Sequence, residues 1–356
     1  MRIAHIVDSM EVGGVETLVA QMCSMQRDIG HEPIVLVIGS VGPLGKRMMS
    51  EGFDVRAPSV GRLPGAVWKF YRVLRQLRPD VVHLHNPTPT SFASIAAKAA
   101  RVPCVVSTRH GLAGKPRRRM TELKYGFSAR FCDRIVGICD ATVMNLKEAH
   151  PSQSRKMVRV YNGILPIVRP PRDQWPAEQG FTLLYVGRLA PVKNLGFLLE
   201  AFRLALQTNS TLRLWLVGDG SERQMLEKFA HHHGVASNVA FWGEQLDPAP
   251  FFSAADAFIM SSTSEGLPIS LLQAFSIGLP AVVTDVGGMA EAVRLTSSGL
   301  IASKDNPVCL TEAILRLAGS AQEQALYGKN ALAGFAAHFT LRAAVSAYQE
   351  LYGVNR

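Results

Sequence analysis

The chain has 356 residues, of which 47% are apolar and 19% charged, and its formal net charge is +10. This composition is typical of a folded protein and excludes a disordered chain, and the length suits two α/β domains better than one. The sequence contains neither the ~20 consecutive apolar residues of a membrane-spanning helix nor a signal-peptide pattern at its start.

Short apolar runs alternate with helical patterns through the first 150 residues. Apolar runs separated by helices indicate a parallel sheet covered on both faces. We therefore expect a Rossmann-like, doubly wound domain over residues 1–165. Its predicted strands are residues 3–7, 34–38, 81–84, 104–107 and 135–138, and its predicted helices are residues 15–25, 67–77, 91–100 and 141–149.

Four prolines between residues 166 and 176 cannot belong to a continuous helix or a central strand, so residues 166–177 are predicted to be a linker. A second α/β series predicts a Rossmann-like domain over residues 178–340, and a last helix within residues 341–356 could pack on either domain, including back on the first. The predicted fold is therefore α/β, with two doubly wound domains facing a cleft. The second domain's predicted strands are residues 181–186, 212–217, 239–242, 257–260 and 281–284, and its helices are residues 195–207, 222–232, 269–277 and 307–317.

The cysteines and the charge distribution bear on location and partners. The cysteines are scattered, odd in number and without a C-x-x-C pair, which predicts reduced thiols and a cytoplasmic protein. Residues 101–160 contain 13 Lys or Arg and 4 Asp or Glu, a local net charge of +9. Such a stretch attracts phosphates on a nucleotide, an anionic membrane or a nucleic acid, although a solvated surface is the plain alternative. The five cysteines are Cys23, Cys104, Cys132, Cys139 and Cys309.

Two glycine-rich turns follow predicted strands. Gly13 and Gly14 stand where the first strand gives way to a helix, and their missing side chains would let an anion approach backbone N–H groups. Gly287 and Gly288 form a similar turn near the end of the second series. Neither turn is the G-x-G-x-x-G dinucleotide fingerprint, and a purely structural turn is an equal alternative for each.

Arg188 and Lys193 follow the first strand of the second series. The planar guanidinium can grip two phosphate oxygens and the ammonium adds a point charge, so the pair fits a diphosphate. Asn194 is placed to cap the next helix. The alternative is a pair of solvated surface charges.

Glu265, Gly266 and Leu267 precede a predicted helix that contains Gln273. A carboxylate beside free backbone N–H groups is suited to binding sugar hydroxyls. Alternatively, Glu265 is only a charge stabilised by the helix dipole.

His110 ends a predicted strand and is followed by a glycine, which favours a functional role over a structural one. Several other segments do not match known functional motifs. Residues 39–46 lack Walker A spacing, His231 to His233 are predicted to lie at the surface, and no zinc-ligand spacing or G-x-S-x-G elbow is present.

Taken together, the motifs resemble the retaining GT-B glycosyltransferases of the group 1, or family 4, type, over nearly the whole chain. Their order is more specific than any one of them. The motifs are Gly13-Gly14-Val15-Glu16, Thr108-Arg109-His110-Gly111, Tyr161-Asn162-Gly163-Ile164, Gly187-Arg188-Leu189 with Lys193-Asn194, Val217-Gly218-Asp219-Gly220, Glu265-Gly266-Leu267-Pro268 and Val286-Gly287-Gly288.

The resemblance implies a nucleotide sugar held by the C-terminal domain and an acceptor held by the N-terminal domain. It implies no metal or other cofactor, because Arg188 and Lys193 would neutralise the leaving diphosphate, and the leaving phosphate would take the acceptor's proton. It places His110 near the reacting end of the sugar. The implied catalytic residues are His110, Arg188, Lys193 and Glu265, and the implied donor-binding residues add Gly13 and Gly14 for the diphosphate, Gly266 and Leu267 for the sugar, and Gln273.

Gln273 departs from the family pattern, which has a second glutamate eight residues after the first to hold the ribose. A glutamine can accept the hydrogen bond without the charge, which predicts donor binding weaker by roughly 1 kcal/mol. The expected function is transfer of a hexosyl group from a nucleoside diphosphate sugar to a glycan or lipid-linked acceptor, in cell-surface polysaccharide or glycolipid biosynthesis. The alternatives are a noncatalytic nucleotide-sugar-binding protein and another GT-B enzyme, such as an epimerase or a phosphorylase.

The basic stretch at residues 115–130 is predicted to dock the enzyme on an anionic membrane, where it would meet a lipid-linked acceptor. This would make a cytoplasmic protein peripheral on the inner face of the membrane. Nucleic acid is not expected as a partner, because few aromatic residues interrupt the basic ones.

Overall fold

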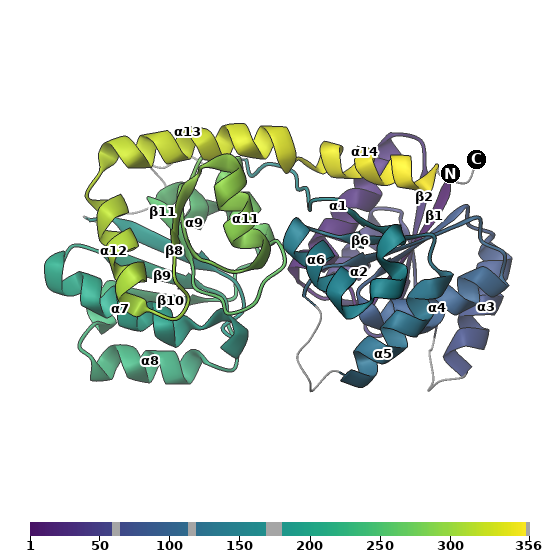
Figure 1. Cartoon of the computed structure of the whole chain (residues 1–356), viewed down its shortest axis with the longest axis horizontal. Helices are drawn as coiled ribbons and strands as arrows, with labels where there is room; N and C mark the ends of the chain where they lie inside the picture. The colour runs from purple at the N-terminus through teal and green to yellow at the C-terminus, as the bar shows by residue number, and fades with distance from the viewer. Residues whose placement is uncertain (59–64, 113–118, 169–179, 354–356) are drawn as a thin grey trace. The chain divides into compact units, whose positions relative to one another are not determined.

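The computed structural model describes residues 1–58, 65–112, 119–168 and 180–353 (Figure 1). The chain forms two compact units. The first comprises Met1–Leu165 together with Thr340–Arg356, and the second comprises Pro166–Phe339. Most of the predicted linker therefore lies outside the described residues.

The first unit is built on a seven-stranded parallel sheet in the order β3-β2-β1-β4-β5-β6-β7. Helices cover the sheet, and the central strands are buried on both faces, as expected for apolar runs in a parallel sheet. The strands are β1 (Arg2–Val7), β2 (Glu32–Val37), β3 (Asp54–Arg56), β4 (Val81–His85), β5 (Cys104–Arg109), β6 (Arg134–Gly137) and β7 (Met157–Arg159). The helices are α1 (Gly14–Asp28), α2 (Gly42–Ser50), α3 (Gly65–Leu77), α4 (Pro87–Ala99), α5 (Arg119–Ser128), α6 (Asp140–Ala149) and α14 (Leu341–Tyr352).

Helix α14 belongs to the first unit although it ends the described chain. It packs against β5 and against α1, which lies below it in Figure 1. The N–H of Leu341 donates to the carbonyl of Ile164 at 2.9 Å, and Gly163 leaves room for the carbonyl of Thr340, which a side chain at that position would strike. The Tyr161-Asn162-Gly163-Ile164 motif therefore anchors the returning helix, and α14 buries Tyr348 and Tyr352 beneath it.

The second unit contains a six-stranded parallel sheet in the order β10-β9-β8-β11-β12-β13. Its core is formed by fully buried apolar residues of the strands and of the helix that follows β8. The strands are β8 (Thr182–Val186), β9 (Arg213–Val217), β10 (Val239–Gly243), β11 (Ala257–Met260), β12 (Ala281–Thr284) and β13 (Gly299–Ala302). The helices are α7 (Leu195–Thr208), α8 (Arg223–His232), α9 (Ala249–Ala254), α10 (Ile269–Ser276), α11 (Gly287–Thr296), α12 (Pro307–Ala318) and α13 (Ala321–His338).

Each sheet has a topological switch point, where successive strands are added on opposite sides of the first one. In the first unit this point lies between β1 and β4, and in the second it lies between β8 and β11. Loops leaving the carboxyl ends of such neighbouring strands diverge and form the crevice where ligands bind in doubly wound folds. The loops after β1, β4, β8 and β11 are therefore the first places to look for a site.

The five cysteines are all free thiols in the structure, and four of them are buried. Among the residues that the structure describes, no helix combines the length and the hydrophobicity needed to cross a bilayer.

Candidate functional site

The loops that follow β8 and β11 lie side by side at the switch point of the second unit. The N–H of Thr263 donates to the carbonyl of Val192 at 2.9 Å. The hydroxyl of Ser261 donates to the carbonyls of Lys193 and Asn194 at 3.0 and 3.1 Å. These bonds join the segment that carries Lys193 to the segment that carries Glu265.

Lys193 and Glu265 form an ion pair between these loops. The Lys193 Nζ donates to Glu265 Oε1, and the Ser262 hydroxyl donates to the same oxygen at 3.0 Å. The two side chains are only 17% and 15% exposed. An ion pair this buried is tolerated when further hydrogen bonds satisfy it, as Ser262 does here. An anionic ligand at this point would share the Lys193 cation with Glu265.

Arg188 lies just beyond β8 with an exposed side chain. Its guanidinium makes no ion pair with any residue in the described part of the chain, so its charge is available to a ligand. The Tyr185 hydroxyl donates to the carbonyl of Arg188 at 3.0 Å and fixes the backbone there. Burial raises the pKa of Tyr185, and the Glu265 carboxylate raises it further while Arg188 opposes the shift. Both charges therefore act on one buried phenol, whose hydroxyl is bonded to the Arg188 backbone.

The segment after Glu265 is packed tightly. Gly266 and Leu267 are buried, and Gly287 has a left-handed φ of +49° with no room for a side chain against the carbonyl of Glu265. The turn at Gly287 thus supports the Glu265 backbone, which only glycine permits without strain. Gln273 is half-buried in α10, and the Ser276 hydroxyl donates to its carbonyl at 2.7 Å. Among the described residues, Lys193 and Glu265 bond to each other and to Ser262, with no hydrogen bond to the Gln273 side chain.

The predicted capping role of Asn194 is wrong in its chemistry. Asn194 does occupy the N-cap position of α7, but it has a left-handed φ of +53° and its side chain makes no capping hydrogen bond. A capping asparagine needs an extended backbone to return its oxygen to the helix N–H groups. Here the short turn at Pro191–Lys193 sets the backbone of Asn194 instead.

The Gly13–Gly14 turn of the first unit is lined by carboxylates. Gly13 is extended at the N-cap of α1, and a side chain on it would strike the Glu16 carboxylate. Burial raises the pKa of Glu16, and the charges of Asp8 and Glu11 raise it further. A diphosphate at this turn would meet these groups. The role of Gly13 and Gly14 toward the donor stays a prediction.

His110 is positioned by its neighbours on β4 and β5. The backbone N–H of His110 donates to the Asn86 Oδ1 at 3.2 Å, and Asn86 adopts an unusual φ of +75° directly after β4. Strained backbone of this kind persists where the surroundings hold it, often at functional sites. The loop beyond His110 is held by Arg109, which is 4% exposed and pairs with Glu122 at 2.5 Å. Arg109 also donates to the carbonyls of Gly111 and Leu112.

Three further histidines that the sequence reasoning missed lie near His110, two of them in one line of hydrogen bonds with it and the third beside that line. His5 Nε2 is 2.8 Å from the Gln26 Oε1, His5 Nδ1 is 3.0 Å from His85 Nε2, and His85 Nδ1 is 3.0 Å from His110 Nε2. His83 stands beside this line, with its ring centroid 4.2 Å from that of His85. Its nitrogens meet the hydroxyls of Tyr352 and Thr108, each at 2.7 Å.

The buried histidines are neutral at pH 7. Burial lowers the pKa of His5 and of His110 to about 4, and lowers those of His83 and His85 well below the usual value. Ligand atoms of His5, His83 and His85 lie within 4.8 Å of one another, a spacing that could hold a metal ion. Every ring nitrogen of the three, however, already has a hydrogen-bond partner, so the cluster is a hydrogen-bond network.

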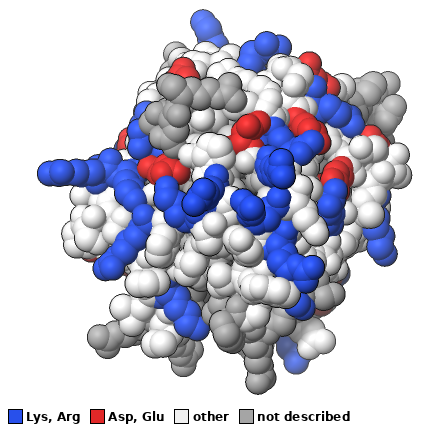
Figure 2. Space-filling model, turned by 90° about the vertical axis from the view of Figure 1, so that its right-hand side faces the viewer, with Lys and Arg blue, Asp and Glu red and all other residues white. Residues whose placement is uncertain are grey.

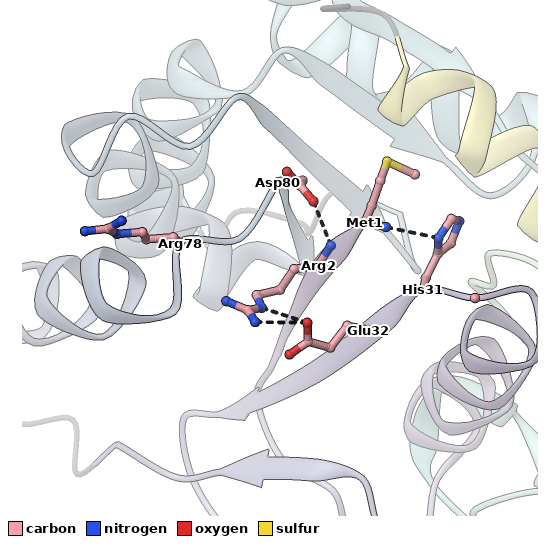
Figure 3. Close-up of a pocket in the computed structure, with 7 residues that line it drawn as sticks. Met1, Arg2, His31, Glu32, Arg78 and Asp80 are labelled. Carbon is pink, nitrogen blue, oxygen red and sulfur yellow. Dashed lines mark hydrogen bonds and ion pairs between the residues drawn. The ribbon is translucent and has the colours of Figure 1, made fainter.

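The first unit also has a cavity of about 440 Å³, which lies at the amino ends of the strands, away from the loops that carry His110 and Gly13. It is found at the amino ends of β1 and β2 (Figure 3), where Arg2 pairs with Glu32 at 3.0 Å and the Arg2 N–H donates to Asp80 at 2.8 Å. Ligands of doubly wound sheets bind at the carboxyl ends, so this cavity is not the candidate site. It is lined by Met1, Arg2, Gly30, His31, Glu32, Arg78 and Asp80.

Two family models match the chain, one in each half. Residues 12–166 match the model described as Glycosyltransferase Family 4, and residues 180–320 match the model described as Glycosyl transferases group 1. Together they cover most of both units. The chain therefore belongs to the group 1, family 4 glycosyltransferases, and it is a transferase enzyme.

Named relatives and solved structures agree with this family. The UDP-Gal:alpha-D-GlcNAc-diphosphoundecaprenol alpha-1,3-galactosyltransferase of Escherichia coli is 26% identical over 69% of this chain and 68% of its own length. The lipopolysaccharide core biosynthesis glycosyltransferase LpsD of Rhizobium meliloti is 26% identical over 89% and 88%. The crystal structure of Anabaena HepE in complex with UDP-glucose has a TM-score of 0.87 at 20% identity, covering 98% of each chain, and it confirms the predicted GT-B fold.

Proposed function

We propose that this chain is a retaining, metal-independent hexosyltransferase that uses a nucleoside diphosphate sugar and acts on a glycan or lipid-linked acceptor. The observation that carries the proposal is the arrangement at the switch point of the second unit. A half-buried Lys193 pairs with Glu265, and an exposed Arg188 stands at the same strand edge without an ion pair to a described residue. Two cations and one carboxylate match a diphosphate joined to a sugar.

The proposed chemistry follows from where these charges lie. The bond between the anomeric carbon and the diphosphate oxygen breaks, and Arg188 and Lys193 stabilise the negative charge that develops on that oxygen. A new bond to the acceptor oxygen forms on the same face of the sugar. The acceptor's proton passes to the departing phosphate, so the step needs no protein nucleophile. Glu265, released from its full pairing with Lys193, accepts hydrogen bonds from sugar hydroxyls, beside the backbone of Gly266 and Leu267.

The printed names of relatives support the substrate classes. The Anabaena structure holds UDP-glucose, and the Escherichia coli relative is named for UDP-Gal and a diphosphoundecaprenol acceptor. A Mycobacterium tuberculosis relative, 26% identical over 85% of this chain, is named a GDP-mannose-dependent alpha-mannosyltransferase. The base and sugar therefore vary among relatives. For this chain we propose a nucleoside diphosphate hexose and a role in polysaccharide or glycolipid biosynthesis.

The test is a donor screen followed by a product assay. A bound donor stabilises the fold by mass action, so a thermal shift with UDP-, GDP- and ADP-hexoses finds the donor. We expect one donor to raise the melting temperature, and transfer to a lipid-linked or glycan acceptor with the anomeric configuration retained, as read by NMR of the product. Binding without turnover would instead indicate a noncatalytic protein. Conversion of the donor without an acceptor would indicate an epimerase.

We further propose that α5 docks the enzyme on an anionic membrane, in the cytoplasm. Met120, Leu123 and Phe127 are 66%, 59% and 54% exposed and stand at helical spacing on one side of α5. Lys124 and Arg130 are exposed beside them. Figure 2 shows one face of the molecule, on which many Lys and Arg side chains are exposed and fewer Asp and Glu. Exposed apolar side chains can enter the boundary between lipid headgroups and acyl chains, and neighbouring basic side chains can bind anionic headgroups. Residues 115–118 of the predicted basic stretch lie outside the described residues.

A further inference from the structure

The backbone around Arg188 is hydrogen-bonded to the end of the neighbouring strand β9 and to the loop that follows it. The Gly187 N–H donates to the carbonyl of Val217 at 2.9 Å, and the Leu189 N–H donates to the carbonyl of Asp219 at 2.8 Å. Strands β8 and β9 are adjacent in the sheet, so these bonds extend their pairing beyond the end of β8. The residues on both sides of Arg188 are therefore fixed to a second segment of the same unit.

One peptide group in this turn is held at both of its polar atoms. The peptide between Arg188 and Leu189 accepts the Tyr185 hydroxyl at its carbonyl, at 3.0 Å, and donates its N–H to Asp219. Because a peptide group is planar, bonds at its opposite edges fix the orientation of the whole group. The Leu189 side chain is 0% exposed and anchors the turn in the core. The backbone from which the Arg188 side chain leaves is therefore set before any ligand binds.

The glycines of the Val217-Gly218-Asp219-Gly220 motif allow this close approach of two loops. A side chain on Gly218 would strike the carbonyl of Gly187, and a side chain on Gly220 would strike the carbonyl of Leu189. Gly218 also has a φ of +130°, a conformation that favours glycine. The motif, whose role the sequence left open, is therefore a fitted support for the turn after β8.

The Tyr185 hydroxyl is a buried polar group whose hydrogen bond supports the same turn. Tyr185 lies in β8 and is 0% exposed. A phenylalanine would fill the space without the cost of burying a hydroxyl, and that cost has to be offset by a hydrogen bond. The bond is made to the carbonyl of Arg188. Burial raises the pKa of Tyr185, so the phenol keeps its proton and remains a donor.

We propose that Tyr185 and the Val217-Gly218-Asp219-Gly220 motif form an arginine clamp, whose members are positioning residues that hold Arg188 in place for the diphosphate. Arg188 is exposed and makes no ion pair with a described residue, so its placement depends on its backbone. A cation that is already in position stabilises a developing charge without the cost of reorganisation. This inference rests on the proposed function for the role of Arg188, whereas the clamp itself is independent of any donor.

The first experiment needs no donor and measures amide hydrogen exchange in the full chain. Tyr185→Phe keeps the ring and removes the bond to the Arg188 carbonyl. The Leu189 amide belongs to the same peptide group and should exchange about fivefold faster, because the loss of one hydrogen bond makes local opening easier. The Thr263 amide, bonded at 2.9 Å in the loop after β11, should exchange as in the wild type.

Unchanged exchange of the Leu189 amide in Tyr185→Phe would overturn the clamp. Equal acceleration of the Leu189 and Thr263 amides would also contradict it, because that result would show a general loss of stability. Neither outcome depends on a donor, so failure of the clamp is distinguished from failure of the proposed function.

The second experiment measures turnover with the donor and acceptor that the screen finds. Tyr185→Phe should lower kcat about fivefold and change KM less, because Arg188 acts on charge that develops in the transition state. In an Arg188→Ala background the same substitution should change kcat by less than twofold, since the side chain that it positions is gone. In a Glu265→Gln background, which alters the other charge near the phenol, the fivefold effect should remain.

The two backgrounds decide whether Tyr185 acts through Arg188. A fivefold effect of Tyr185→Phe in the Arg188→Ala background would overturn the positioning role. Loss of the effect in the Glu265→Gln background alone would overturn it too, because Tyr185 would then act through Glu265. Tyr327→Phe is the control, since it removes a hydroxyl of α13 in the same unit, and it should keep the wild-type kcat and the wild-type exchange at position 189.

The second half of the clamp is tested with a pair of glycine variants. Gly220→Ala places a methyl group against the Leu189 carbonyl and should lower kcat at least as much as Tyr185→Phe. Gly234→Ala, at a φ of +69° with no atom near the new methyl group, should keep the wild-type kcat. If Gly220→Ala does not fold, Tyr185→Phe decides the proposal. A wild-type kcat for Tyr185→Phe, or for folded Gly220→Ala, would contradict it.

Discussion

Acidification should destabilise the first unit through its buried histidines, and His5 allows the size of the effect to be worked out. The pKa of His5 is about 4 in the fold and 6.5 ordinarily. The unfolded chain therefore takes up a proton near pH 6.5 that the folded chain refuses until pH 4. Stability is fully present above pH 6.5, falls as the pH drops through this window and becomes constant again below pH 4.

Each unit of pKa difference corresponds to about 1.4 kcal/mol, so His5 alone lowers the free energy of unfolding by about 2 kcal/mol at pH 5 and by about 3 kcal/mol below pH 4. His83, His85 and His110 shift in the same direction and add to the loss. The full chain is measured by differential scanning calorimetry between pH 7 and pH 5. The free energy of unfolding of the wild type should fall by several kcal/mol between these two pH values.

His5→Gln removes one of these proton-uptake sites. At pH 7 this variant should unfold at a lower temperature than the wild type, because a buried hydrogen-bonded group is changed. Its loss of free energy of unfolding between pH 7 and pH 5 should, however, be about 2 kcal/mol smaller than the wild-type loss. His232→Gln, at an exposed position of α8, is the control and should match the wild-type slope. A wild-type transition that does not move between pH 7 and pH 5, or a His5→Gln slope equal to the wild type, would refute the assignment of neutral buried histidines.

Two further predictions concern the donor and the membrane. Gln273→Glu should tighten donor binding about fivefold, since a charge-assisted hydrogen bond to the ribose gains roughly 1 kcal/mol; calorimetric titration showing unchanged or weaker affinity would contradict the assigned role of this position. The double variant Leu123→Glu with Phe127→Glu should lose flotation with anionic vesicles, while Leu246→Glu, at a 91% exposed position of the second unit, should float like the wild type. Equal recovery of the wild type with neutral and anionic vesicles would rule out docking by charge.

The sequence was sufficient for the architecture, because strands buried on both faces are recognisable as apolar runs between helices. Each of the ten predicted strands corresponds to a strand of the two sheets. Two of the elements that went unpredicted have weak patterns. Strand β3, Asp54–Arg56, has three residues with a charge at each end, and helix α13, Ala321–His338, is rich in alanine and lacks a strong apolar stripe.

The contacts within the candidate sites could not be predicted from the sequence, because they depend on which strands lie next to each other in the sheets. Lys193 and Glu265 were predicted to serve the same ligand, yet their direct pairing requires that β8 and β11 lie side by side. His5, His83 and His85 were hidden inside apolar runs. A histidine in a strand that is buried on both faces needs a hydrogen-bond partner, and the sequence shows such histidines. It does not show which residues are the partners, because the parallel register brings His5 beside His83 across nearly eighty residues.

The measurement that tests the central claim most directly is the turnover of Arg188→Ala with the donor found by the screen. Removing a preorganised group that stabilises the leaving charge should lower kcat by about 100-fold or more. Arg203→Ala, which removes an arginine paired with Glu200 on the surface of the same unit, should keep the wild-type rate. A rate for Arg188→Ala equal to that of Arg203→Ala would contradict the assignment of the donor diphosphate to this strand edge.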